Sequence, residues 1–168
     1  MMKNVYPIVL LLILSLLGAC KKSEYNDELT RSKDVYMAFK ASADNNYKYV
    51  VSTGSWTGYS TATTLTIQNG KVVGRAYIAK TIENNVVKVV QEWVEDAATL
   101  GSHSEGAALQ NLDEVYERAQ KEWLKKRDDA TVYFEAKNQG MISSAGYVPE
   151  NCQDDCFRGI SISAITKL

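Results

Sequence analysis

Two cysteines near the end of the chain, Cys152 and Cys156, enclose three polar residues in the stretch NCQDDCFRG. Such a pair suits a disulfide, a metal site or a redox site. A zinc site needs four ligands, whereas this chain has one histidine and no second cysteine pair. A thioredoxin-type motif has two residues between its cysteines, and this loop has three. The spacing therefore favours a structural disulfide if the chain folds in an oxidising compartment, with redox chemistry as the weaker alternative.

The same loop carries acidic side chains that suit a hard cation. Glu150, Asp154 and Asp155 supply carboxylate oxygens, which are ligands that calcium prefers. We therefore regard these three residues as candidate calcium ligands, an alternative role for the loop beside its disulfide. The sequence contains no other metal-ligand cluster and no nucleotide-binding motif, so we predict no cofactor apart from this calcium alternative.

The compartment is indicated by the start of the chain. Residues 1–19 combine a basic n-region with an apolar run that is too short to span a bilayer comfortably, which is typical of a signal peptide. The run ends in LGAC, residues 17–20, which resembles the bacterial lipobox ahead of a lipidated cysteine. We predict that residues 1–19 are removed and that Cys20 receives lipid. An ordinary N-terminal helix and an uncleaved anchor are the alternatives.

A lipid on Cys20 predicts a place in the bacterial cell envelope. Several acyl chains together form a durable membrane anchor, whereas a single chain binds only marginally. The next residue is Lys21 rather than the aspartate of inner-membrane retention, which favours the outer membrane. Residues 20–28 then form a flexible tether, and residues 29–168 form a single domain that faces the periplasm or the exterior. Export also supplies the oxidising space that the disulfide requires.

The charge of the chain restricts its partners. It contains 19 basic and 20 acidic residues, so its formal charge is nearly balanced. The one basic cluster, Lys125-Lys126-Arg127, is typical of a solvated helix end, whereas a nucleic-acid site needs basic charge over a whole face. We therefore expect the membrane, and an envelope protein or a glycan, as partners, and we do not expect nucleic acid.

The sequence lacks a convincing catalytic arrangement. His103 is the only histidine, and it lies in the loop-like stretch LGSHSEG between Ser102 and Ser104, without a nucleophile elbow. We expect this histidine to be an exposed loop residue. The carboxylates of Glu92 and Glu95 are expected to be solvated on a strand. We predict that the protein is not an enzyme, and hydrolysis is the least favoured of the functions considered.

An aromatic loop offers a better functional hypothesis. Trp56 and Tyr59 lie among glycine, serine and threonine in GSWTGYSTAT, residues 54–63. Such rings can bind a sugar or a peptide. The commoner arrangement, which we favour for Trp56, is that the ring folds back over one end of the core. The sequence thus predicts a non-catalytic binding module, and the alternative is an accessory subunit that holds an envelope complex through an exposed sheet edge.

Two amphipathic helices are predicted. The first runs from Leu29 to about Ala43, with Val35, Tyr36 and Phe39 on its apolar face. The second begins at Leu112, where Asn111 caps the first turn and Glu114 completes a capping box. Its apolar stripe continues through the positions Val115, Tyr116, Ala119 and Trp123.

Strand patterns follow each helix. A strand at residues 47–52 precedes two hairpins, whose turns are predicted at Asn69-Gly70 and Asn84-Asn85. Three more strands are expected in ATVYFEAK, MISSAGYV and GISISAI, after residue 129. Amphipathic helices and a one-sided sheet bury their apolar faces most simply against each other. We predict an α+β fold in the order α-β4-α-β3, with two helices on one face of a curved antiparallel sheet.

Several short motifs occur in an order that resembles the DUF6174 family of small exported bacterial proteins. They are the YKY strand at residues 47–49, NGKVV at 69–73, NLDEVY at 111–116 and GYVP at 146–149. The tract from about residue 32 to 165 resembles this family.

The chain departs from that family in two respects. Cys152 and Cys156 surround its acidic pair, and a longer segment separates the hairpin from the second helix. The resemblance implies a fold and an exported location, but no reaction, because no activity is assigned to the family.

Overall fold

The computed structural model describes residues 25–153 and 156–168, and it shows an α+β fold in which the sheet dominates. The predicted signal peptide and Cys20 lie outside the described residues. In chain order, the elements are α2 (Asn26–Ser42), β1 (Tyr47–Gly54), β2 (Ser60–Gln68), β3 (Lys71–Glu83), β4 (Val86–Glu95), α3 (Leu112–Arg118), the π-helical turn η1 (Ala119–Trp123), β5 (Ala130–Glu135), β6 (Ser144–Pro149) and β7 (Arg158–Lys167).

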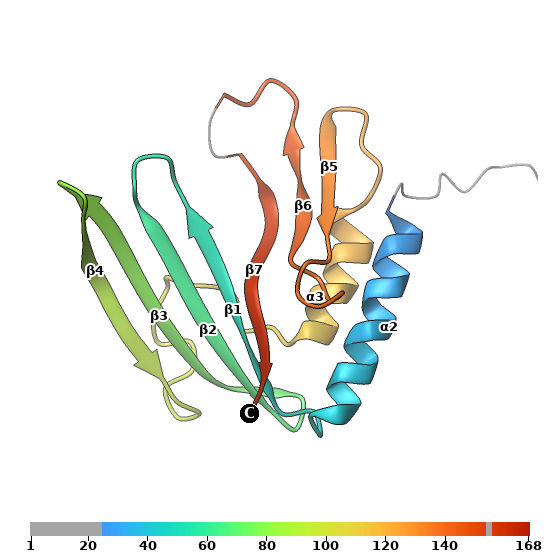
Figure 1. Cartoon of the computed structure of the whole chain (residues 1–168), viewed down its shortest axis with the longest axis horizontal. Coiled ribbons are helices and arrows are strands. Elements are labelled where there is room, and N and C mark those ends of the chain that lie inside the picture. Colours follow the sequence, from blue (N-terminus) through green and yellow to red (C-terminus); the bar gives the residue numbers. More distant parts are fainter. Residues whose placement is uncertain (1–24, 154–155) are drawn as a thin grey trace, which may run out of the picture.

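Seven antiparallel strands form one sheet in the order β4-β3-β2-β1-β7-β6-β5 (Figure 1). Two meanders, β1 to β4 and β5 to β7, meet where the last strand pairs with the first. The predicted order of one helix, four strands, a second helix and three strands is confirmed. Both helices contact the hydroxyl of Tyr47 on β1, so they lie on the same face of the sheet.

Strand β7 changes its partner halfway along its length. Its first part, Arg158 to Ser161, pairs with β6, whereas the part from Ile162 onward pairs with β1. The side chain of Asn138 lies at this change and donates hydrogen bonds to the carbonyls of Ile142, at 2.8 Å, and Ile162, at 3.0 Å. The amide therefore supplies donors where the regular ladder is interrupted.

Both predicted hairpin turns are confirmed. Asn69 and Gly70 have φ angles of 49° and 77°, and Asn84 and Asn85 have φ angles of 52° and 61°. Asparagine and glycine tolerate this left-handed region better than other residues, and the resulting turns match the twist of the paired strands. Local sequence alone is therefore sufficient to place these two hairpins.

The start of α3 also follows its sequence signal. The side chain of Asn111 accepts a hydrogen bond from the Glu114 amide, and the Glu114 carboxylate accepts one from the Asn111 amide. The helix then widens into η1, where the Leu124 amide donates to the Ala119 carbonyl at 2.9 Å. Every position of the predicted apolar stripe is buried: Leu112, Val115, Tyr116, Ala119 and Trp123.

The predicted apolar face of α2 needs a correction. Tyr36 is buried as expected, but the Val35 side chain is 41% exposed. The buried face instead runs through Leu29, Ser32 and Tyr36. Apolar periodicity missed Ser32 because it is polar, and its place in the core depends on a hydrogen bond of 2.8 Å with the Tyr116 hydroxyl on the other helix.

Tyrosine hydroxyls connect the helices to the sheet inside the core. The hydroxyls of Tyr36 on α2 and Tyr47 on β1 lie 3.2 Å apart, and Tyr47 also accepts a hydrogen bond from the Leu112 amide at 3.0 Å. That amide belongs to the first turn of α3, where no carbonyl within the helix is available. Tyr116 accepts a further hydrogen bond from the Ile142 amide at 2.9 Å. Buried polar groups are thus satisfied by partners far away in the sequence.

Burial keeps these tyrosines neutral. It raises the pKa of Tyr36, Tyr47 and Tyr116 above the ordinary value, and for Tyr36 the hydrogen bond with Tyr47 raises it further. Burial also raises the pKa of Tyr49, whose hydroxyl donates to the Gln110 carbonyl at 2.6 Å. The network consequently acts through neutral hydrogen bonds rather than through charge.

A pair of glycines holds β6 and β7 unusually close together. Gly146 and Gly159 are directly opposite each other in the ladder. A Cβ atom on Gly159 would lie 2.1 Å from the Ala145 carbonyl oxygen, and one on Gly146 would lie 2.5 Å from the Phe157 ring. Neither position therefore has room for a larger residue.

We predict that Gly159→Ala destabilises the fold by about 1–3 kcal/mol, the usual cost of overpacking, because the backbone of β6 must move. Urea unfolding followed by circular dichroism measures this change. Gly54→Ala is the matched control, since a Cβ at Gly54 meets nothing within 4 Å. Equal stability of the two variants would contradict the close approach of β6 and β7.

Candidate functional site

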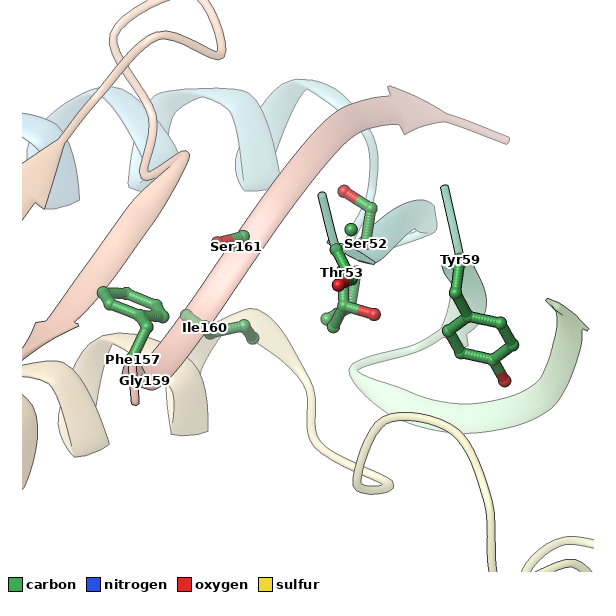
Figure 2. Close-up of a pocket in the computed structure, with 10 residues that line it drawn as sticks. Ser52, Thr53, Tyr59, Phe157, Gly159, Ile160 and Ser161 are labelled. Atoms are coloured by element: carbon green, nitrogen blue, oxygen red, sulfur yellow. The ribbon is translucent and has the colours of Figure 1, made fainter. Parts of the chain in front are cut away.

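A cleft opens in the sheet where β1 and β7 separate. Their ladder ends at the pair Val51 and Ile162, although β1 continues to Gly54 and β7 has already begun at Arg158. The space between the two strands has a volume of about 730 Å³. Figure 2 shows Ser52, Thr53 and Tyr59 on one side of it, and Phe157, Gly159, Ile160 and Ser161 on the other.

On the β1 side, main-chain groups point into this cleft. The Ser55 amide donates to the Tyr59 carbonyl at 2.8 Å, so Ser55 directs its main-chain groups towards the β2 side. Along an antiparallel strand, successive residues direct their amides and carbonyls alternately towards the neighbouring strand on one side and the neighbouring strand on the other. Ser52 and Gly54, three residues and one residue before Ser55, therefore direct their amides and carbonyls away from β2. The described β1–β7 register contains no partner for either residue.

Main-chain groups on the β7 side also point into the cleft. The Ile162 amide donates to the Ser143 carbonyl at 2.7 Å, so Ile162 faces the β6 side at this point. By the same alternation, Ser161 and Gly159 direct their main-chain groups towards β1. The cleft thus lies between two strand edges that face each other.

The side chains of the cleft are neutral. Hydroxyls come from Ser52, Thr53, Ser55 and Ser161, and rings come from Tyr59 and Phe157, while none of the described lining residues carries a charge. Donors and acceptors spaced along two strands, with an aromatic ring at each side, suit a neutral ligand with alternating amides or hydroxyls. They do not suit an anion or a metal ion, which need charged or convergent ligands.

Tyr59 is held in the cleft wall by a hydrogen bond with Tyr77, whose ring belongs to a row of stacked rings. Burial, followed by a hydrogen bond with Tyr59, raises the pKa of Tyr77 to about 12. The Tyr77 ring stacks on Trp93 with centroids 5.2 Å apart, and Trp93 stacks on His103 at 4.2 Å. The Tyr59 side chain remains 42% exposed, so its ring is fixed on one side and accessible on the other.

Trp56 lies apart from the cleft, and one expectation about it is wrong. Its side chain is 83% exposed, so the ring does not fold back over the core. It is also not among the residues that line the cleft. The structure therefore separates the two predicted ligand-binding residues: Tyr59 belongs to the cleft, and Trp56 stands on the hairpin tip beyond it.

The cysteine loop borders the cleft through Phe157. The Cα atoms of Cys152 and Cys156 lie 6.2 Å apart, within the range that a disulfide spans, so the predicted pair is at bonding distance. Of the candidate calcium ligands, Glu150 is described, whereas Asp154 and Asp155 lie outside the described residues. Residues 25–153 and 156–168 contain no group of three His, Cys, Asp or Glu side chains placed to hold a metal ion.

A buried ion pair beneath the loop of residues 96–110 was not predicted. Arg75 donates two hydrogen bonds to Glu95, at 2.9 and 2.8 Å, and both side chains are almost fully buried. The expectation that Glu95 is solvated is therefore wrong, while Glu92 is exposed as expected. The sequence did contain a signal: the alternation of β3 places Arg75 on the same face of the strand as Tyr77 and Ala79, which are buried.

The loop closes over this ion pair through its main chain. Glu95 accepts hydrogen bonds from the amides of Gly101, at 3.0 Å, and His103, at 2.8 Å. Arg75 donates to the carbonyls of His103, at 2.8 Å, and Ala107, at 3.0 Å. The hydrogen bonds from Arg75, followed by those from the loop amides, lower the pKa of Glu95 well below its ordinary value, against the opposing effect of burial.

His103 lies in a loop as expected, but it is half-buried rather than exposed. Its ring is nearly parallel to the Trp93 ring, with an angle of 4° between the planes. Its Nδ1 lies 3.1 Å from Glu95 and 3.2 Å from the Ser102 hydroxyl. A Ser-His-acid triad needs the acid and the nucleophile on opposite ring nitrogens. These three side chains therefore do not form a triad.

Comparison with known proteins gives no identification. No family model, no curated protein and no solved structure matches this chain. Among the residues that the structure describes, no helix has the length and apolar character needed to cross a membrane. The resemblance to the DUF6174 family stays a prediction.

We predict that Glu95→Gln lowers the melting temperature by several degrees at neutral pH, because Arg75 is left buried without a carboxylate. The folded-state pKa of Glu95 is depressed, so its contribution is complete above the ordinary value of 4.5 and is lost as the pH falls towards the folded-state value. The gap between wild type and variant should therefore narrow below about pH 4.5.

Thermal melts followed by circular dichroism between neutral pH and about pH 3 test this expectation. Glu92→Gln is the matched control, since Glu92 is an exposed residue of the same strand. A Glu95→Gln variant with the same melting temperature as Glu92→Gln at neutral pH would contradict the role given to the ion pair.

Proposed function

We propose that this protein is a membrane-tethered binding module that holds an extended peptide segment in the cleft between β1 and β7. The observation that carries the proposal is the early end of the β1–β7 ladder, which leaves two strand edges facing each other across the cleft. An added strand satisfies such edges with its own amides and carbonyls. The protein then acts by capture, without a chemical step.

The glycine on the β1 side of the cleft favours a peptide over a sugar. Gly54 lines the cleft, and a strand glycine often marks a site where another backbone approaches closely. A Cβ on Gly54 would meet nothing within 4 Å, so this position is open to a ligand. Tyr59 and Phe157 lie at the two sides, where they can pack against alternate side chains of the peptide.

The tether of this module is proposed from the N-terminal sequence. The LGAC stretch at residues 17–20 supports lipid on Cys20, and the proposed location is the cell envelope, in the outer membrane. An extended peptide is a common form of ligand in that setting, because envelope proteins expose unpaired strands and tails before assembly.

We predict that Gly54→Trp abolishes or weakens peptide binding by about ten-fold or more, because the indole occupies the cleft. Fluorescence anisotropy with labelled heptapeptides rich in Val, Ile and Thr measures the affinity. Lys48→Trp is the matched control, since it places the same ring on an exposed position of the same strand, outside the cleft. Both variants should melt at nearly the same temperature as the wild type.

The chemistry of the probe provides a second control. Peptides whose amides are methylated lose the donors that an added strand uses, so they should bind about ten-fold more weakly or worse. Maltoheptaose tests the sugar alternative in the same assay. Binding of the sugar at the Gly54 position, with no binding of any heptapeptide, would contradict the proposed ligand class.

The tether has its own test. We expect the mature protein from bacterial membranes to begin at Cys20 and to carry the mass of acyl chains on that residue. Mass spectrometry of the intact chain measures both properties. A Cys20→Ser variant should remain unprocessed at this site, because serine provides no thiol for the lipid. A soluble chain that retains residues 1–19 would contradict the envelope location.

The exposed edge of β4 favours a second candidate, the accessory subunit of an envelope complex. Val89, Val90 and Val94 are each more than half exposed on this strand, which lies at the edge of the sheet. Long apolar edges of this kind usually pair with another chain or are shielded. A partner that binds the Gly54→Trp variant as well as the wild type would favour this edge over the cleft.

A further inference from the structure

The start of α2 lies at the same end of the molecule as the tips of two hairpins. The helix has 17 residues and β1 has 8, so each is about 25 Å long. A tight turn at residues 43–46 joins them, and the chain reverses its direction there. The first turn of α2 and the end of β1 therefore lie at the same end of this helix–strand pair. In Figure 1 the β3–β4 turn lies along the same upper edge of the fold, on the side of the sheet away from α2.

This end carries an apolar knob that the fold leaves uncovered. Trp56 stands on the β1–β2 tip, and Ile82, Val86 and Val87 flank the β3–β4 turn, each with more than half of its surface exposed. The two tips touch, since a Cβ on Gly58 would lie 3.2 Å from the Cβ of Ile82. Surfaces of soluble proteins seldom gather such residues without a partner.

The length of the preceding chain indicates the partner. The segment from the proposed lipid site, Cys20, to the residue before α2, Tyr25, comprises six residues with both ends included. Even fully extended, they span at most about 20 Å. If lipid is attached at Cys20, the end of the domain with the apolar knob is therefore close to the bilayer, whereas the opposite end, with the Asn69-Gly70 turn, points away.

We propose that Trp56, Ile82, Val86 and Val87 dock on the lipid surface and orient the domain on the membrane. This inference rests on the proposed lipid anchor. Tryptophan is enriched at membrane interfaces, because its ring is apolar while its indole N–H bonds to water or headgroups. Branched aliphatic side chains beside it add apolar area, and the acyl chains supply the attachment that these few residues lack alone.

The docked orientation also defines the peptide that reaches the cleft. Gly54, which lines the cleft, is the last residue of β1, so the cleft reaches the β1–β2 tip that carries Trp56. The cleft therefore opens close to the lipid surface. Its ligands are then extended segments that leave the membrane or lie along it, rather than segments far from the bilayer.

Fluorescence quenching by brominated lipids tests this docking on the full lipidated chain, reconstituted into phosphatidylethanolamine and phosphatidylglycerol vesicles. The chain has three tryptophans, and Trp93 and Trp123 are shielded within the domain, so Trp56 is the one that lipid can reach. We expect strong quenching in the wild type and loss of most of it in Trp56→Phe. Equal quenching in the two proteins would overturn the inference.

Paired substitutions on β4 sharpen the test. Val87→Glu should reduce the quenching of Trp56, because it places a charge at the lipid surface beside the β3–β4 turn. Val94→Glu is the matched control at the other end of the same strand, and its side chain is at least as exposed. The two variants should melt alike. Equal quenching of Trp56 in both variants would contradict docking through the β1–β2 and β3–β4 hairpin tips.

The outcome separates this inference from the proposed anchor. Acyl mass on Cys20 without quenching of Trp56 would overturn the docking and leave the tether standing. Absence of acyl mass would overturn the tether, and quenching that persists in such a chain would show that the tips bind lipid by themselves. A dimer in sedimentation, with Trp56 protected from lipid, would assign the knob to a second copy and overturn the inference.

Discussion

Buried hydroxyl groups hold the two helices of this protein in place on its sheet. Tyr47 on β1 connects the hydroxyl of Tyr36 on α2 to the Leu112 amide at the start of α3. In the same way, the hydroxyl of Tyr116 on α3 bonds to Ser32 on α2 and to the Ile142 amide in the loop after β5. A buried hydroxyl without a partner is costly, so each bond is satisfied only when both helices take one position. The direction of α2 follows from this constraint.

The cleft lies where β7 changes its pairing partner from β6 to β1. The close approach of Gly146 and Gly159 draws the first half of β7 towards β6, while its second half completes the sheet with β1. The β1–β7 ladder therefore ends at Ile162, and β1 and β7 are unpaired with each other along the part of β7 that pairs with β6. The side chain of Asn138 satisfies carbonyls at the change of partner. The cleft is thus bounded by the main-chain edges of two strands and by neutral side chains.

The correct predictions concern features whose causes are local. The turns at Asn69-Gly70 and Asn84-Asn85 and the capping box at Asn111 depend on residues within four positions of one another. The errors concern side chains whose partners are distant. Glu95 is buried because Arg75, twenty residues away, supplies its hydrogen bonds. The same limit applies to Val35, His103 and Trp56, whose exposure depends on elements that periodicity does not place.

The sequence by itself determined the order of helices and strands, the turn positions, the capped start of the second helix and the distinctive LGAC stretch at residues 17–20. These features follow from backbone preferences and short-range hydrogen bonds, which a single chain segment encodes. Only the tertiary structure decided that β1 and β7 separate, that Tyr59 lines the cleft and that Trp56 stands outside it. The reason is that strand pairing and burial depend on contacts between segments more than a hundred residues apart, and local patterns carry no information about which edge meets which.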